Sequence, residues 1–152
     1  MTGFELAMAI KERRLGAPPP WVEHMRVLEE NPIQVLEVGR VVTAWRPGPQ
    51  FTVRDGYVQG GLLAALADGG QYLALLSTLE TPESWVTIDL HTRFVRPIKQ
   101  HEAVTIESRV LSRTATSAIV ETTFTLAGER LAAKVTGGWR ASPTRPVPGT
   151  PA

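Results

Sequence analysis

The stretch Asp55–Leu76, which reads DGYVQGGLLAALADGGQYLALL, decides how the rest of the chain has to fold. It opens with a glycine-rich turn and continues as an apolar run of helical length. The run leaves almost no polar face, so it predicts a helix that is buried nearly all round. One carboxylate, Asp68, interrupts it, and a buried carboxylate is costly unless it is paired or partly solvated. Gly69 and Gly70 each cost about 1 kcal/mol of helix propensity relative to alanine, so we expect close packing or a local break there.

The composition is that of an ordinary soluble domain. Of the 152 residues, 43% are hydrophobic and 20% are charged, and this length and composition allow one sizeable core. A formal net charge of +1 gives no electrostatic reason to expect nucleic acid or a membrane surface as a partner. The absence of cysteine excludes disulfides, thiol catalysis and cysteine-ligated metals. The chain begins without a signal-peptide pattern and holds no bilayer-length apolar run, so we expect a cytoplasmic protein.

The chain divides into three predicted segments. Residues 1–30 form an N-terminal helical segment, with short helices over 1–15 and 21–30 separated by prolines. Residues 31–141 form one domain that contains the apolar helix. Residues 142–152 hold four prolines and are predicted to be disordered.

Strand patterns flank the apolar helix on both sides. Before it, residues 33–42 predict one strand with a kink at Gly39. After it, strand patterns cover residues 86–96, 104–110, 118–126 and 131–140. Along the first of these, Val86, Ile88 and Leu90 alternate with polar residues and are expected on one face. The last three strands have short connections, which predicts an antiparallel meander. The sum is an α+β domain, an antiparallel β-sheet wrapped around a central apolar α-helix.

Several motifs in this order resemble those of the hotdog-fold acyl-CoA thioesterases, and most closely the PaaI-like branch. They are Tyr57–Gly61, Leu62–Asp68, Val86–Leu90 and Arg93–Pro97. Members carry His-Gly-Gly at the start of the central helix, a carboxylate two turns later, a Thr/Ser-Val-Asp strand motif and an Arg-Pro at its end. The resemblance covers about residues 33–141. It implies the hotdog fold, hydrolysis of acyl-CoA without a metal or redox cofactor, and composite sites in a homodimer.

The residues themselves suggest how such a site would work. Attack on a thioester carbonyl creates an oxyanion, which free N–H groups at a helix start stabilise. Gly60 and Gly61 lie at that start, and without side chains they let a substrate approach the backbone closely. Asp68 would be the nucleophile or the general base. The resemblance implies that Thr87, which matches the Ser/Thr of the family's strand motif, would position the water or the carboxylate. It also implies that Gln59, in the place of the family's histidine, would orient the thioester or the helix start.

The spacing of these groups has a consequence for assembly. Gly60 and Asp68 are eight residues apart, which places their Cα atoms about 12 Å apart in a continuous helix. One carbonyl cannot lie within about 3 Å of both groups. We therefore predict that Gly60 of one subunit faces Asp68 of another across a two-fold axis, in a dimer or a dimer of dimers.

Each candidate residue has a plainer alternative. Asp68 could be a helix-end carboxylate, and Gly60-Gly61 could be only a tight turn. Arg93 and Arg96 could bind the phosphates of coenzyme A or could simply be solvated. Asp89 fits a surface role as well as a functional one. The three histidines have no spacing that indicates a metal site or a catalytic triad.

The sequence also departs from the family pattern. Gln59 stands where members have histidine, and glutamine cannot transfer protons near neutral pH. Val53 stands where related enzymes often carry Asn or Gln. These departures keep open an alternative function, a non-catalytic hotdog domain that binds acyl-CoA or another acyl ligand or acts as an assembly module.

Overall fold

The computed structural model describes residues 1–143 and 147. Its elements in chain order are α1 (Gly3–Lys11), α2 (Pro20–His24), α3 (Val27–Glu30), β1 (Ile33–Glu37), β2 (Arg40–Trp45), a 3₁₀ turn η1 (Pro49–Phe51), α4 (Gly60–Leu76), β3 (Trp85–Phe94), β4 (Val104–Arg113), β5 (Ser117–Leu126) and β6 (Arg130–Ala141). Most of the tail predicted to be disordered lies outside the described residues. No helix in the described part of the chain is both long and apolar enough to cross a membrane.

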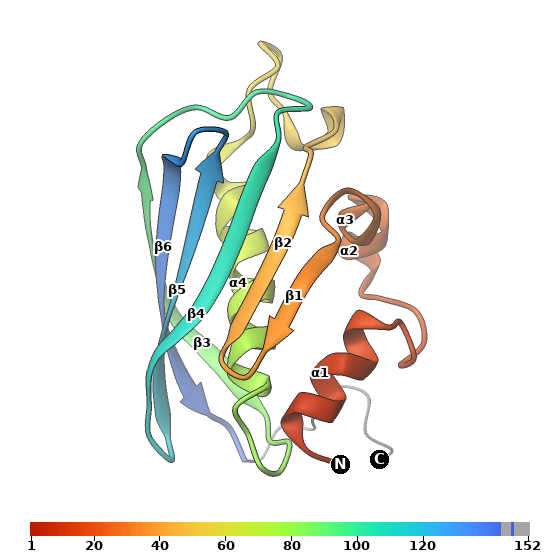
Figure 1. The fold of residues 1–152 in the computed structure, drawn as a ribbon, viewed down its shortest axis with the longest axis vertical. Coiled ribbons are helices and arrows are strands. Elements are labelled where there is room, and N and C mark those ends of the chain that lie inside the picture. The colour runs from red at the N-terminus through yellow and green to blue at the C-terminus, as the bar shows by residue number, and fades with distance from the viewer. Residues whose placement is uncertain (144–146, 148–152) are drawn as a thin grey trace.

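The strands form one antiparallel sheet that curves around α4 (Figure 1). Their order is β1-β2-β4-β5-β6-β3. The β4-β5-β6 meander predicted from short connections is confirmed, and so is the α+β sheet around a central helix. Strand β3 follows α4 in the chain but pairs with β6, which leaves β3 at an edge of the sheet.

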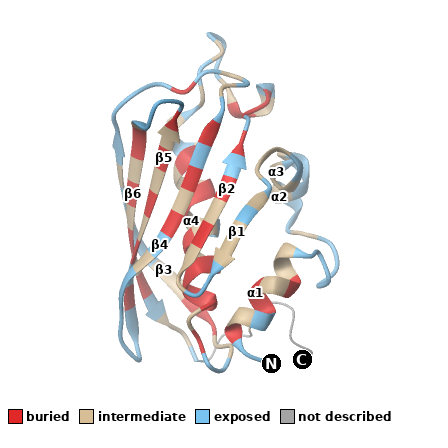
Figure 2. Cartoon of the chain, viewed as in Figure 1, coloured by how far each residue is buried: buried red, intermediate tan, exposed pale blue. Residues whose placement is uncertain are grey.

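Helix α4 joins two parts of the core, one at each of its ends. Its first half packs with Trp45 and Phe124 of the sheet, and its second half packs with Trp85, Trp139 and α1. Figure 2 shows these buried positions as red bands on the helix and the strands that face it. The prediction that α4 is buried nearly all round is wrong for a single chain, because among the described residues nothing covers one face of the helix. The residues of this open face are exposed or only partly buried: Gly61, Ala64, Ala65, Asp68, Gly69 and Tyr72.

The glycine pair after Asp68 does not break the helix, which continues through all 17 residues. Close packing explains Gly70, since a Cβ there would lie 2.6 Å from the Ser108 hydroxyl of β4. Gly69 lies on the exposed side of the helix, and a Cβ there would meet no atom within 4 Å. Of the two explanations that the sequence left open, close packing is confirmed at Gly70.

Two predictions for the first third of the chain are wrong. The strand expected over residues 33–42 is a hairpin, because Gly39 at φ +75° turns the chain and β1 pairs with β2. The helix expected over residues 21–30 is divided into α2 and α3, because Arg26 adopts the left-handed region at φ 54°. In both places a single residue with positive φ ends a regular element.

A β-bulge in β3 changes which side chains face the helix. Thr87 pairs with Trp139 and Asp89 pairs with Gly138, so Ile88 is an extra residue in the ladder. The bulge resets the alternation, and Thr87 and Leu90 therefore both face α4. The expectation that Val86, Ile88 and Leu90 share a face is wrong for this reason. Ile88 is 56% exposed.

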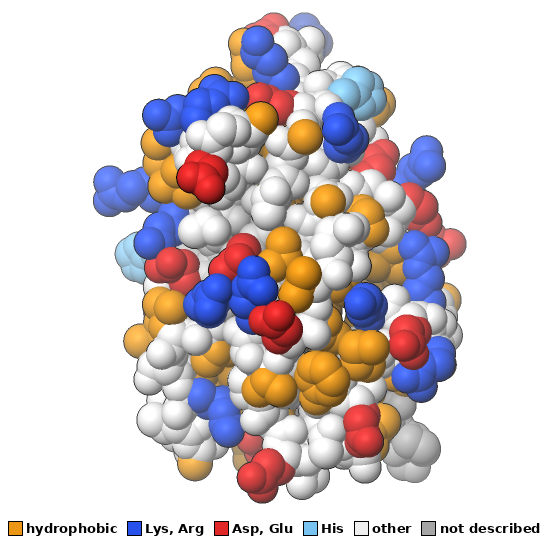
Figure 3. Space-filling view, viewed as in Figure 1, with side chains coloured by type: hydrophobic (Ala, Val, Ile, Leu, Met, Phe, Trp, Pro, Cys, Tyr) orange, Lys and Arg blue, Asp and Glu red, His pale blue; other side chains and the backbone are white. Residues whose placement is uncertain are grey.

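The outer face of the sheet carries interspersed acidic and basic side chains (Figure 3). Arg40 and Arg109 lie directly opposite each other on β2 and β4, which would be unfavourable without an anion between them. Glu107 accepts hydrogen bonds from Arg40 at 3.0 Å and from Arg109 at 2.8 Å. The Arg40 guanidinium, with a smaller contribution from Arg109, lowers the pKa of Glu107 below its ordinary value of 4.5.

This charge cluster predicts a pH-dependent contribution to stability. Because the folded-state pKa of Glu107 is lowered, the contribution is complete above the unfolded pKa and is lost as the pH falls through the folded pKa. We expect Glu107→Gln to reduce the free energy of unfolding by about 1 kcal/mol near neutral pH and to have no effect once the wild-type carboxyl is protonated. Urea unfolding across this pH range measures the difference. Glu80→Gln, at an exposed position, is the control, and an equal loss for Glu107→Gln at every pH would contradict the prediction.

Candidate functional site

The start of α4 leaves backbone donors free. Gln59 is the N-cap residue, but its side chain makes no capping hydrogen bond. Its own N–H donates to Phe51 O at 2.8 Å, and Leu62 N donates to Gln59 O at 3.0 Å. Within the described residues, the N–H groups of Gly60 and Gly61 meet no acceptor. Two free donors at the positive end of the helix dipole can stabilise a negative oxygen.

The two glycines at this start differ in what surrounds them. A Cβ on Gly61 would meet no atom within 4 Å, whereas a Cβ on Gly60 would lie 2.9 Å from the ring of Phe94. Open space for a ligand therefore lies at Gly61, and Gly60 makes room for an aromatic ring. Phe94 itself is 58% exposed. Sequence reasoning missed this contact, because nothing in the sequence distinguishes Phe94, the last residue of β3, from other apolar strand residues.

Asp68 and Thr87 form the second part of the site. Thr87 Oγ1 of β3 donates to Asp68 Oδ1 at 2.5 Å, in a part-buried position between the helix and the edge strand. Partial solvation and this hydrogen bond explain how an apolar helix carries a carboxylate. Among the described residues no partner meets Asp68 Oδ2, which is left to accept a hydrogen bond from water or substrate.

The bulge that directs Thr87 toward α4 also explains why the Asp89 carboxylate bonds to the backbone of β6. The Asp89 carboxylate accepts a hydrogen bond from Gly138 N at 3.0 Å, across the irregular step in the β3–β6 ladder. It satisfies a donor that the bulge leaves without a strand partner. Asp89 therefore has a structural role here.

The predicted residues fall into two groups within one chain. Gln59, Gly60 and Gly61 lie at the start of α4, and Asp68 lies with Thr87 two turns later. The helix between them is continuous, so the separation of about 12 Å expected from helix geometry applies.

Among the described residues, no hydrogen bond or ion pair joins Arg93 or Arg96 to either group. Arg96 donates to Leu131 O at 2.7 Å, which anchors its side chain to the start of β6. Arg93 is exposed on β3. The described residues contain no cluster of three His, Cys, Asp or Glu side chains suited to a metal ion.

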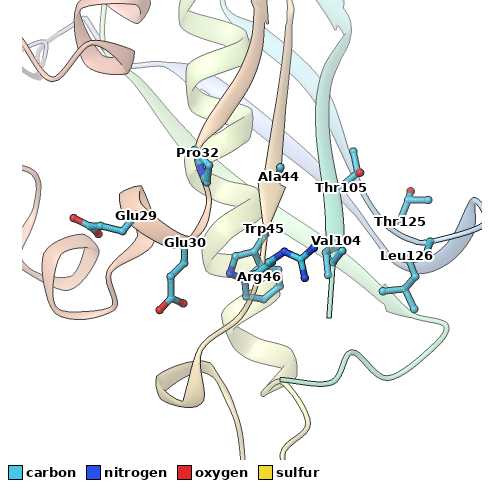
Figure 4. Close-up of a pocket in the computed structure, with 12 residues that line it drawn as sticks. Glu29, Glu30, Pro32, Ala44, Trp45, Arg46, Val104, Thr105, Thr125 and Leu126 are labelled. Carbon is cyan, nitrogen blue, oxygen red and sulfur yellow. The ribbon is translucent and has the colours of Figure 1, made fainter. Parts of the chain in front are cut away.

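A surface pocket of about 570 Å³ lies elsewhere, where α3 meets the ends of β2, β4 and β5 (Figure 4). Glu29, Glu30 and Arg46 supply its charged side chains, beside the buried Trp45. None of the predicted site residues lines it. The carboxylate and the free N–H groups are thus at the open face of α4 and not in this pocket.

Comparisons with known proteins agree on one family. Residues 55–133 match the thioesterase superfamily. A protein of Saccharolobus solfataricus that is named as an esterase is 34% identical over 104 residues, which cover 68% of this chain and 73% of that protein.

Solved structures show the same fold. Zebrafish thioesterase superfamily member 2 superposes with a TM-score of 0.78 at 23% identity, over 93% of this chain and 99% of the other. The PaaI protein of Escherichia coli gives a TM-score of 0.75 at 16% identity, over 92% and 93% of the two chains. A Streptococcus mutans protein bound to acetyl-CoA gives a TM-score of 0.70 at 22% identity, over 80% of this chain and 95% of the other. These likenesses confirm the hotdog fold.

The contrast between the two glycines is testable by stability measurements. Alanine is favoured over glycine in helices by up to about 1 kcal/mol, so Gly61→Ala is expected to be neutral or stabilising. Gly60→Ala has to displace the Phe94 ring and is expected to lose that gain. In a Phe94→Ala background the two alanine substitutions should have the same effect on the free energy of unfolding, measured in urea. A persistent difference in that background would show that something other than Phe94 restricts Gly60.

Proposed function

The chain belongs to the thioesterase superfamily, and from this premise we propose that it hydrolyses an acyl-CoA thioester to a free carboxylic acid and coenzyme A. The observation that carries the proposal is the Asp68 carboxylate, held by Thr87 at the open face of an apolar helix. The free N–H groups at the start of α4 supply the complementary donors. A CoA thioester is the ligand class favoured by the S. mutans neighbour, whose structure contains acetyl-CoA.

The groups present suit attack on a thioester carbonyl. In the general-base route, Asp68 accepts a proton from water while the water oxygen bonds to the carbonyl carbon, and the carbonyl oxygen becomes an oxyanion near the N–H groups of Gly60 and Gly61. Collapse of this intermediate breaks the C–S bond, and coenzyme A leaves as a thiol after taking up a proton. In the nucleophilic route, an Asp68 oxygen attacks the same carbon, coenzyme A leaves, and water hydrolyses the resulting anhydride. In either route the Thr87 hydroxyl donates its hydrogen bond to Asp68 Oδ1, so Oδ2 is the oxygen left to react.

The proposed site combines two chains. Within one chain the donors and the carboxylate are too far apart to act on one carbonyl, so the start of α4 from one protomer would meet Asp68 of its partner. The open face of α4 and the free edge of β3 are neighbouring surfaces, because Thr87 of β3 contacts Asp68 of α4. Apolar side chains are exposed along that edge, with Ile88 at 56% and Val95 at 46%. A homodimer through these surfaces would cover them and complete two equivalent sites.

The role of Asp68 predicts the first experiment. Thiol release from a panel of acyl-CoAs is expected in the wild type, and Asp68→Ala is expected to lower the rate at least about 100-fold because the base or nucleophile is lost. Asp55→Ala, which removes an exposed carboxylate before the same helix, should leave the rate unchanged.

Two outcomes would contradict this assignment in different ways. Release that persists in Asp68→Ala would exclude Asp68 as the reacting group. A wild-type protein that binds coenzyme A but releases no thiol from any substrate would favour the binding module instead.

Mixing two inactive variants tests whether the site is shared. Asp68→Ala lacks the carboxylate, and Gly61→Val fills the open space at the helix start. If sites are composite, each mixed dimer has one site with both defects and one intact site, so random reassociation of equal amounts should restore about a quarter of wild-type activity. Sites contained in one chain would give no restored activity. Each variant alone is the control, and native mass spectrometry measures how far the chains have mixed.

A further inference from the structure

Gln71 is a fully buried polar residue in α4 whose presence the hydrolysis reaction does not explain. It is 0% exposed, and a buried amide is costly unless its donors and acceptor are satisfied. Gln71 Nε2 donates to Val135 O at 3.2 Å, and its Oε1 accepts from Trp139 Nε1 at 3.0 Å. Both partners belong to β6, so the amide connects the helix to that one strand.

Strand β6 is shaped to receive this amide. Gly137 lies between Val135 and Trp139 on the face that the helix covers, and a Cβ there would lie 1.9 Å from Gln71 Oε1. The missing side chain leaves the space in which the Gln71 amide lies. Alanine at 137 would force the amide out, so the glycine and the glutamine act together.

The contact made by Gln71 is adjacent to the contact made by Asp68. Trp139 of β6 is the direct ladder partner of Thr87 of β3, and Thr87 donates to Asp68. Asp68 and Gln71 are three residues apart, one helical turn, and therefore lie near the same side of α4. Two hydrogen bonds thus join neighbouring points of the helix to paired residues on adjacent strands.

The turn of α4 between Asp68 and Gln71 has a weak intrinsic preference for the helical conformation. Gly69 and Gly70 separate Asp68 from Gln71, and each lowers the intrinsic helix preference by about 1 kcal/mol relative to alanine. Apolar contacts hold the helix against the sheet but are not directional. The two hydrogen bonds of Gln71 to β6 add a directional contact that favours the rotation and height of the helix at which Asp68 meets Thr87.

We propose that Gln71 is a positioning residue for the reaction, which locks α4 to β6 so that the Asp68 carboxylate stays on the Thr87 hydroxyl. The catalytic part of this inference rests on the proposed thioesterase function, and the geometric part does not. Trp139 donates to the Gln71 amide and Gly137 leaves the space for it, so both residues take part in this positioning. The sequence held a partial signal, since Gln71 is the polar residue one turn after Asp68 in an apolar run.

The test compares Gln71→Met with Ser108→Ala. Methionine keeps the length of the side chain and removes both hydrogen bonds. Ser108→Ala also removes a buried hydrogen bond beside α4, the 2.8 Å contact with Thr122, but on β4 and away from Thr87. A crystal structure of Gln71→Met is expected to show the Asp68–Thr87 contact lengthened beyond hydrogen-bonding distance, and Ser108→Ala is expected to retain it. An unchanged contact in Gln71→Met would overturn the inference, whatever the activity.

Kinetics provide the second arm. Gln71→Met should lower kcat about 10-fold or more with KM within about twofold, as for supporting residues that orient reactive groups. Combined with Thr87→Val it should cause no further loss, because both act on one contact; losses that multiply would overturn the positioning role. Ser108→Ala should leave both parameters unchanged. If Gln71→Met does not fold, Trp139→Phe, which removes the indole N–H together with part of the ring, replaces it in both arms. A wild type without thioesterase activity would refute the proposed function, and the crystal structures would still decide the geometric part.

Discussion

The hydrogen bond from Thr87 to Asp68 links the central helix to the edge strand, and much of the surrounding structure accommodates it. The carboxylate lies in an otherwise apolar helix, so it has to lie where it is both hydrogen-bonded and partly hydrated. The boundary between α4 and β3 satisfies both conditions. The bulge at Ile88 directs Thr87 toward the helix while Leu90 also faces the core, and Asp89 satisfies the backbone donor that the bulge leaves over.

Close approach between α4 and the sheet depends on missing side chains. At three positions the place of a Cβ is taken by another residue: Phe94 at Gly60, Ser108 at Gly70 and Gln71 at Gly137. Of these neighbours, only Gln71 also forms hydrogen bonds between α4 and the sheet, whereas the Ser108 hydroxyl bonds to Thr122 of β5. Gly60 and Gly70, which weaken α4 as an isolated helix, therefore allow close packing against the sheet, and Gly137 of β6 makes room for the Gln71 amide.

The outer face of the sheet and the face that carries α4 differ in whether their polar groups find partners within one chain. On the outer face of the sheet, Glu107 pairs with Arg40 and Arg109, and Arg40 also pairs with Glu37, so these two arginines and two glutamates form ion pairs within the chain. On the other side, no element among the described residues covers Gly61, Asp68 and Gly69 on the open face of α4, and within the same residues the neighbouring strand β3 has a free edge. The proposed reaction needs the donors and the carboxylate from this side, and a second copy of the chain would bring them together.

Periodicity and residue type along the sequence were enough to predict the antiparallel sheet, its meander and the central helix, because local alternation and turn residues are properties of adjacent residues. The resemblance to a known family, together with the chemistry of the residues, indicated Gln59, Gly60, Gly61, Asp68 and Thr87 as candidate site residues, and the structure places Asp68 with Thr87. The hairpin at Gly39 and the break at Arg26 were missed, since a positive φ depends on what the chain packs against. The Phe94 contact with Gly60, the bulge that turns Thr87 inward and the bonding of Gln71 to β6 were decided only by the tertiary structure. Each joins residues distant in the chain, and their contact depends on strand register and helix rotation, which local sequence does not set.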